Sequence, residues 1–105
     1  MEHPLVPPDT LDAVAHRFKV LGEPVRLELL DMLQARGEMT VGALVEATGH
    51  RQANVSKHLG RMAEEGLVRR RQEGVHVHYA VDDPTVMALC QLVRGRLNGS
   101  IDTSE

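Results

Sequence analysis

Apolar residues in the first third of the chain recur at the three- and four-residue spacing of a helix. A first helix, which Asp9 or Thr10 can cap and Gly22 ends, has an apolar side made of Leu11, Val14, Ala15, Phe18 and Leu21. Pro24 suits the first position of a second helix, because its missing N–H is not needed there. That helix runs to about Arg36, and its inward side is Val25, Leu29, Leu30 and Leu33. The pattern therefore predicts two amphipathic helices on one core.

Two further helices are predicted on either side of a tight turn. Thr40 is a good N-cap for a short third helix, and Gly49 is a good stop for it. The fourth helix begins near Gln52 and ends at Gly66. Its expected buried stripe is Ala53, Val55, Leu59, Met62 and Ala63. Two helices joined in this way have the outline of a helix-turn-helix.

After Gly66 the apolar period changes from helical to two. Leu67–Arg71 and Val75–Val81 alternate as strands, and Gln72-Glu73-Gly74 suits the hairpin between them. One strand face is expected to carry Val75, Val77, Tyr79 and Val81. A fifth helix starts at Asp83-Pro84, with apolar positions Val86, Leu89, Leu92, Val93 and Leu97. The predicted fold class is mainly α (α+β), a winged helix-turn-helix of order ααααββα.

Length and composition predict one domain without a membrane span. Residues 1–8 form a proline-rich N-terminal arm, residues 9–98 the winged helix-turn-helix domain, and residues 99–105 a flexible tail. No apolar run approaches the ~18 residues of a span, and the N-terminus lacks a secretion signal. The one cysteine, Cys90, suits a reducing compartment. We therefore expect a cytoplasmic protein with no membrane partner.

Charge is distributed unevenly along the chain. Residues 50–71 hold six basic and two acidic side chains, a net charge of +4, whereas the whole chain carries −3. For DNA binding, a local basic patch matters more than the overall charge. Because this window coincides with the helix-turn-helix pattern, the sequence predicts a protein that binds double-stranded DNA.

The fourth helix keeps a polar face beside its apolar stripe. Gln and Asn can pair with adenine, and Arg or Lys can read guanine or bind phosphate. The start of the third helix can hold a phosphate, and the basic hairpin, with His76 or His78, can follow the backbone or enter a minor groove. The predicted DNA-binding residues are Thr40, Arg51, Gln52, Asn54, Ser56, Lys57, His58, Arg61, Arg70, Arg71 and His76.

The first and fifth helices carry more apolar surface than the helix-turn-helix core can use. Burial of both against a second copy of the chain is the favoured solution, and packing over the core of the same chain is the alternative. A twofold dimer can place two reading helices ~34 Å apart, one turn of DNA. The expected partners are therefore a second copy and an operator with an inverted repeat.

Three motifs in this order resemble the ArsR/SmtB family of bacterial winged-helix repressors. They are Phe18–Leu30, Gln52–Leu59, and Glu65–Val68 leading into Gly74–Tyr79, and the resemblance covers roughly residues 10–98. It implies a homodimer through the first and last helices. It also implies a repressor that occupies its operator until a signal releases it.

The signal-binding positions are where this sequence departs from that family. The family's thiolate site looks like Glu-Leu-Cys-Val-Cys-Asp-Leu, and Glu38–Leu44 has no cysteine. Of the zinc site in the last helix only Asp83 remains, and it is better explained as an N-cap. Since zinc needs about four ligands in a fixed geometry, we expect neither metal site and no cofactor.

Two alternatives to a repressor with an unidentified effector stay open. One is a winged-helix module that binds protein and does not read DNA. The other is a metal-responsive repressor with a non-standard histidine site, since His3 of Met1-Glu2-His3 can chelate copper or nickel with the amino terminus. Cys90 is expected to pack as a small apolar residue. No nucleophile–base pair, phosphate loop or metal constellation is visible in the sequence, so we do not expect an enzyme.

Overall fold

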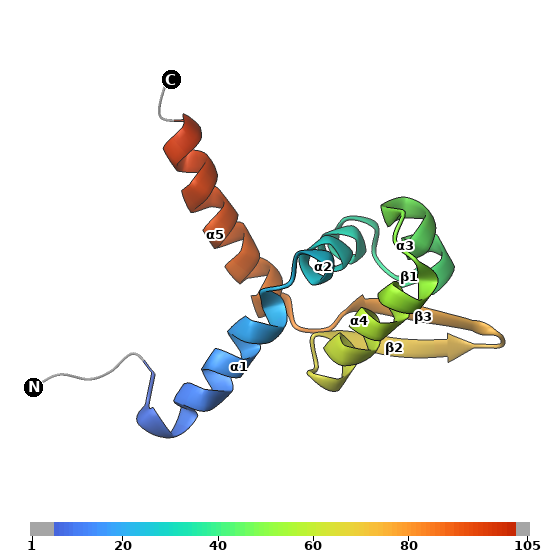
Figure 1. The fold of residues 1–105 in the computed structure, drawn as a ribbon, viewed down its shortest axis with the longest axis horizontal. Coiled ribbons are helices and arrows are strands. Elements are labelled where there is room, and N and C mark those ends of the chain that lie inside the picture. The colour runs from blue at the N-terminus through green and yellow to red at the C-terminus, as the bar shows by residue number, and fades with distance from the viewer. Residues whose placement is uncertain (1–5, 103–105) are drawn as a thin grey trace, which may run out of the picture.

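The computed structural model describes residues 6–102, with side chains up to residue 98. A short 3-10 helix, Pro8–Thr10, precedes five α-helices in this part of the chain: α1 Leu11–Leu21, α2 Pro24–Arg36, α3 Val41–Thr48, α4 Gln52–Glu64 and α5 Pro84–Asp102 (Figure 1). The three strands are β1 Met39–Thr40, β2 Val68–Glu73 and β3 His76–Val81. They form an antiparallel sheet of order β1-β3-β2. No helix in the described residues is long and apolar enough to cross a membrane.

The predicted fold class and the element order ααααββα are confirmed, with one addition. β1 pairs Met39 with Tyr79 and Thr40 with His78 along the inner edge of β3. Two residues are too short for a period of two to be visible in a sequence. This strand joins the start of α3 directly to the hairpin.

The predicted ends of α2 and α3 are confirmed. The Thr40 side-chain oxygen accepts a hydrogen bond of 3.1 Å from the Ala43 N–H, which caps α3. Gly49 ends that helix with a φ of +78°, in the left-handed region that favours glycine. α2 runs from Pro24 to Arg36, as the sequence predicts.

The caps of α1 and α5 differ from each other. At α1 the N-cap residue is Thr10, one of the two that the sequence offers, but its hydroxyl donates to the Pro7 carbonyl and does not cap the helix, while Asp9 lies in the 3-10 helix. At α5 the Asp83 carboxylate accepts from the Thr85 N–H at 3.0 Å, which confirms Asp83 as an N-cap. α5 continues past Asn98 to Asp102, so the helix does not end where the sequence predicts.

The turn of the hairpin is tighter than predicted, and β2 continues two residues past the predicted end at Arg71. Glu73 pairs with His76, which leaves Gly74 and Val75 as the two turn residues, and Gly74 has a φ of +61°. Val75 therefore lies at the tip and is 90% exposed, so its expected place on the face of Val77 and Tyr79 is wrong.

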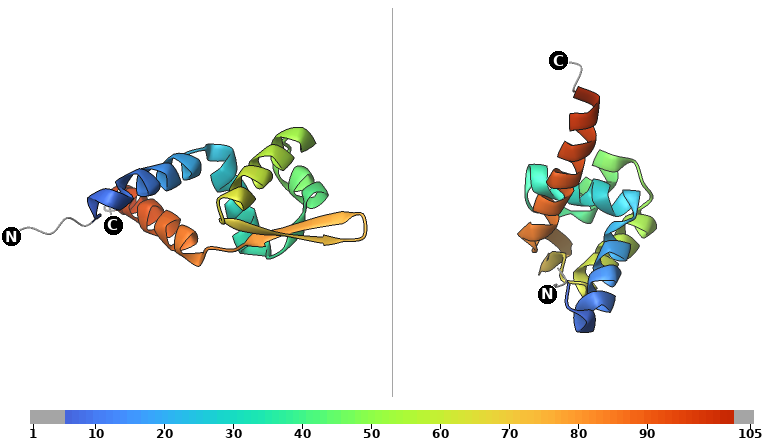
Figure 2. Two further views of the ribbon diagram at one scale, coloured as in Figure 1. Left: turned by 90° about the horizontal axis from the view of Figure 1, so that it is seen from below. Right: turned by 90° about the vertical axis from the view of Figure 1, so that its left-hand side faces the viewer.

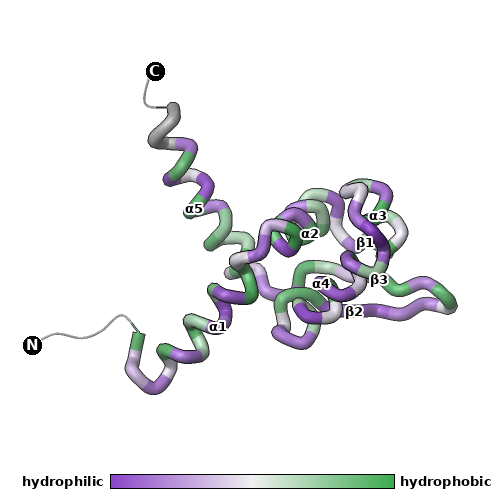
Figure 3. Tube along the Cα trace, viewed as in Figure 1, coloured by the Kyte–Doolittle hydropathy of each residue, from purple (hydrophilic) through white to green (hydrophobic). Residues whose placement is uncertain are grey.

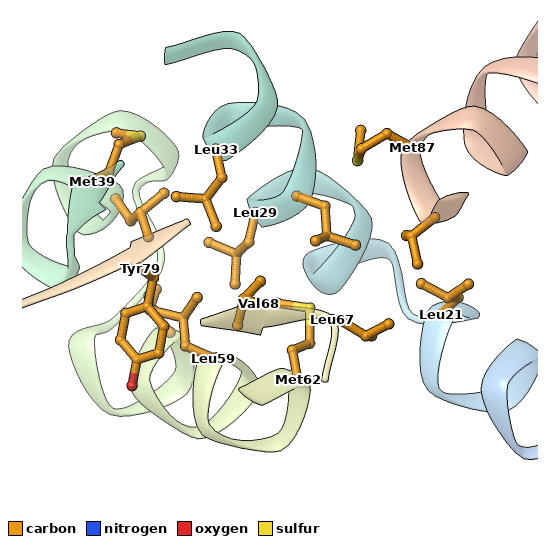
Figure 4. Close-up of a cluster of buried hydrophobic side chains, with 14 of the residues drawn as sticks. Leu21, Leu29, Leu33, Met39, Leu59, Met62, Leu67, Val68, Tyr79 and Met87 are labelled. Carbon is orange, nitrogen blue, oxygen red and sulfur yellow. The ribbon is translucent and has the colours of Figure 1, made fainter. Parts of the chain in front are cut away.

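The core lies between α2, α3, α4 and the sheet, and the end of α1 and the start of α5 contribute Leu21 and Met87 to its edge (Figure 4). Leucines from the three helices are fully buried, and the Tyr79 ring lies against the side of Leu59. Ala53 was expected in this core, but it is exposed in the first turn of α4. We call the unit formed by α2, α3, α4 and the sheet the head.

α1 and α5 diverge from the head on the side opposite the hairpin tip (Figures 1 and 2). Both carry hydrophobic segments beyond the head (Figure 3). Their large exposed apolar side chains are Leu11, Phe18, Leu92, Val93 and Leu97. Much of the apolar surface expected on these two helices is therefore exposed in the single chain, whereas Leu21 and Val86 of the same stripes are buried.

Candidate nucleic-acid interface

The exposed side of α4 begins directly after the turn that follows α3. In that turn the Thr48 hydroxyl donates to the Leu44 carbonyl and accepts from the His50 N–H. The predicted contacts that are exposed on α4 and just before it are Arg51, Gln52, Ser56, Lys57 and Arg61, and Asn54 is half-buried. The structure thus brings six of the predicted residues onto α4 and the residue directly before it.

Most of these side chains are not committed to other groups. Within residues 6–98, no side-chain hydrogen bond or ion pair engages Arg51, Gln52 or Lys57. In the same part of the chain, the one side-chain contact of Arg61 is a long ion pair of 3.9 Å with Glu65. Exposed donors and acceptors without partners can exchange water for base edges or phosphates at little loss of protein contacts.

The predicted placement of His58 on this exposed face is wrong, and its buried position argues against the predicted DNA contact. It is 8% exposed, and its Nδ1 accepts a hydrogen bond of 3.0 Å from Nε of Arg26. The physical reason is helical spacing: position 58 lies three residues after Val55 and four before Met62, on the buried side. The imidazole connects α4 to α2.

This buried contact favours a neutral imidazole. Burial lowers the pKa of His58 from its ordinary value, and the positive charge of Arg26 lowers it further. Arg26 also donates from Nη1 to the Val20 carbonyl at 2.9 Å. The role of Arg26 could not be predicted from the sequence, because one arginine near a helix start gives no signal of a partner 32 residues away.

Two other histidine contacts hold the ends of α4. His16 of α1 lies 2.8 Å from a carboxylate oxygen of Glu65, which follows the last residue of α4, and this hydrogen bond lowers the pKa of Glu65. His50, before α4, lies 2.7 Å from Glu28 of α2. Together with His58, these contacts fix the position of α4 relative to α1 and α2.

The arginines of β2 have different environments. Arg71 donates from Nη2 and Nε to the two carboxylate oxygens of Glu38 at 2.8 and 2.9 Å, and from Nη1 to Glu73 at 3.2 Å. These bonds raise the pKa of Arg71 and lower that of Glu38. Arg70, by contrast, is exposed and has no side-chain partner in the described part of the chain.

The register explains why these neighbours differ. Arg70 is opposite Tyr79, whose ring faces α4, whereas Arg71 is opposite His78 on the other face of the sheet. Directly opposed residues project from the same side of a sheet. Arg70 is therefore on the side that bears α4, and His76 is exposed next to the hairpin tip.

Thr40 is half-buried, and its side-chain oxygen is already used to cap α3. A phosphate at this helix start would therefore meet backbone N–H groups of the first turn rather than the hydroxyl.

The histidines and acids of the described residues include no group of three or more placed to share one metal ion. Met1-Glu2-His3 lies outside the described residues. Cys90 of α5 is half-buried, and burial raises the pKa of its thiol above the ordinary value.

The chain is similar to known DNA-binding regulators over most of its length. Residues 21–71 match the family model described as a helix-turn-helix domain. The chain is 40% identical over 93 residues to the "Probable mercury resistance operon repressor" of Streptomyces lividans, covering 89% of this chain and 71% of that protein. It is also 37% identical over 62 residues to the arsenical resistance operon repressor of Escherichia coli, covering 59% of this chain and 53% of that protein.

Solved structures agree with these sequence matches. An antimony-specific transcriptional repressor superposes with a TM-score of 0.85 at 28% identity, covering 98% of this chain and 93% of that one. The homodimeric winged helix-turn-helix DNA-binding domain of a possible ArsR-family regulator from Mycobacterium bovis superposes with a TM-score of 0.75 at 33% identity, covering 93% and 90%.

Proposed function

The chain belongs to the ArsR/SmtB family of winged helix-turn-helix DNA-binding transcriptional regulators, and on that basis we propose that it is a cytoplasmic, homodimeric repressor of an operator with an inverted repeat. The observation that carries the proposal is the exposed, uncommitted polar face of α4. Gln52 and Asn54 at its start read bases, and Lys57 and Arg61 further along bind phosphate or guanine. Arg51, Ser56, Arg70 and His76 complete the contact surface.

Two of the originally predicted contacts have a smaller part in this proposal. Arg71 is bound to Glu38 and Glu73, so its charge is largely balanced within the protein. Thr40 positions the start of α3, whose N–H groups face the phosphates of the DNA backbone. Arg71 and Thr40 therefore shape the surface, and Arg70 supplies the hairpin's phosphate contact.

The dimer is supported by the apolar groove between α1, α2 and α5. This groove has a volume of about 820 Å³ and is lined mainly by apolar side chains, among them Phe18, Leu27, Met32, Leu89 and Leu97. A monomer seldom leaves so much apolar surface in contact with water. A second copy that covers the groove also places a second α4 along the same DNA face.

The effector of this repressor acts elsewhere than at the family's thiolate and zinc sites. At those positions the chain has Thr40 and Gly42 in place of cysteines, and Thr85 and Arg96 in place of histidines. The Asp83 carboxylate is occupied as the cap of α5 and by Arg17.

Two single substitutions test the proposed roles of α4 in base recognition and of the hairpin in phosphate binding. Gln52→Ala is expected to cost ~1–3 kcal/mol on the operator and to relax specificity, because it removes a base contact. Arg70→Ala is expected to weaken binding to the operator and to random DNA alike. It should also lower the slope of log affinity against log salt concentration by about one. Equilibrium binding over a salt series checks both. Equal affinity of the wild type for operator and random DNA would contradict the proposal.

A further inference from the structure

A cavity lies between α1 and α4, beside the exposed face of α4. Its volume is about 530 Å³, within the ~300–1,000 Å³ typical of small-molecule sites. α1 supplies Lys19, α2 supplies Arg26, and α4 supplies Lys57 and Arg61. Gly60 forms part of the α4 wall, and a Cβ there would meet no atom within 4 Å, so the space above it is open.

The charged lining of the cavity favours an anion. Lys19, Arg26, Lys57 and Arg61 carry four positive charges, against two negative charges on Glu23 and Glu64. These six side chains give the lining a net charge of +2. A ligand with two negative charges would balance it.

One of these cations is held in place before any ligand arrives. The Arg26 guanidinium donates to His58 from Nε and to the Val20 carbonyl from Nη1. Within the described residues, Nη2 of Arg26 and the amines of Lys19 and Lys57 have no hydrogen-bond partner. A fixed guanidinium loses little freedom when it binds an oxyanion, and its planar donors suit carboxylates and phosphates equally.

We propose that this cavity binds a small dianion, either a phosphate monoester or a dicarboxylate, and that the bound ligand lowers affinity for DNA. The regulatory half rests on the proposed function, because Ser56, Lys57 and Arg61 line the cavity and also belong to the proposed DNA surface. An anion held there neutralises the charges that would meet phosphates. It also draws on Arg26, the residue that holds His58 and with it α4.

Ligand binding is tested first without DNA. Isothermal titration of the full chain with glycerol 3-phosphate and with succinate separates the two chemistries. We expect wild type to bind at least one of them, and Lys19→Ala to weaken that binding roughly tenfold or more, as loss of a charged hydrogen bond would. Gly60→Leu, which fills the open space, should abolish binding. Arg36→Ala, a matched loss of charge outside the cavity, should leave it unchanged.

Two results would contradict the proposed binding site. One is no binding of either probe to wild type. The other is binding that Lys19→Ala and Gly60→Leu leave intact while thermal unfolding shows both variants to be folded.

The proposed effect of the ligand on DNA binding is tested by competition at the operator. With the bound probe at ten times its dissociation constant, the apparent operator Kd should rise about tenfold, at an ionic strength matched with KCl because salt alone weakens binding. Lys19→Ala should keep its operator affinity and lose the response to the probe. If Lys19→Ala instead weakens operator binding and lowers the salt slope by about one, the cavity holds a DNA phosphate, and the proposal is wrong.

Failure of the proposed function gives a different result. A wild type that binds no DNA sequence selectively would contradict the repressor, while the titrations without DNA would still decide whether the cavity binds a dianion.

Discussion

The head and the two flanking helices have similar amphipathic sequences but bury them differently. In the head, Leu44 and Leu59 are 0% exposed, whereas Phe18 of α1 and Leu97 of α5 are 54% and 62% exposed. An apolar stripe indicates that one face of a helix is buried in the folded protein. It does not indicate whether the same chain or a second copy buries it. The head, with the near ends of α1 and α5, completes a core within one chain, whereas the far parts of the two flanking helices stay exposed.

Polar contacts follow the same division. Within the head, α4 is joined to α2 through His58 and Arg26, and the hairpin is joined to β1 through Arg71 and Glu38. A polar contact between the flanking helices joins Arg17 of α1 to Asp83, the N-cap of α5, at 3.0 Å. The far half of α5 therefore extends away from the rest of the chain (Figure 1).

The largest expected effect is in the core of the head. Leu59→Ala should destabilise the protein by about 3–4 kcal/mol, because it removes a fully buried side chain and leaves a cavity. Val75→Ala, at the exposed hairpin tip, should change stability by less than about 0.5 kcal/mol. Urea unfolding of both variants measures the difference, and equal losses would contradict the placement of the core.

Leu97→Asp should act on association rather than on the head. A charge in a buried interface should weaken dimerisation by about 2 kcal/mol, while the circular dichroism of the head stays unchanged. Ala88→Asp is the matched control, since position 88 lies nine residues away on the opposite side of α5. Sedimentation equilibrium gives the dimer Kd of each, and equal dissociation in the two variants would show that the groove is not the interface.

Thr40→Ala should cost the head about 1 kcal/mol through loss of the α3 cap. Thr40→Ser keeps the oxygen that accepts from Ala43 and should restore most of that stability. Both are measured by urea unfolding. A loss of the same size in the serine variant would point to the threonine methyl group, or to β1, instead of the cap.

The smallest expected effect is a pH dependence from His58. Its folded pKa lies below the unfolded one, so the unfolded chain takes up the proton first as pH falls below ~6.5. Stability should therefore decline as pH falls from ~6.5 toward the folded pKa and level off below it. His58→Gln keeps an acceptor for Arg26 without titrating, so its stability should fall less over this window, before the carboxylates titrate. Parallel unfolding curves for wild type and variant from pH 7.5 to about 5.5 would exclude this assignment.

The sequence was informative wherever a rule depends on neighbouring residues. The ends of α2 and α3 follow from Pro24, Thr40 and Gly49, whose backbone preferences act locally. The two-residue strand β1 was missed, because its pairing with Tyr79 and His78 depends on residues 38 or more positions later.

The candidate site was predictable to a similar extent. The exposed residues of α4 follow from helical periodicity, and the burial of His58 follows from the same periodicity, since it lies between Val55 and Met62 on the inner side. The bidentate contact between Glu38 and Arg71 spans 33 residues of chain and has no local signal. The cavity beside Lys19 likewise exists only where α1, α2 and α4 meet.

The most direct test of a twofold DNA reader is selection of binding sites from a random duplex pool, followed by affinity measurements at fixed salt. We predict an inverted repeat whose half-site centres lie about 10 base pairs apart, bound at least ~1,000-fold more tightly than random duplex. Insertion of about five base pairs between the half-sites should remove most of that preference, because it turns them to opposite faces of the DNA. Recovery of no sequence preference, or of a single half-site unaffected by the insertion, would contradict the account.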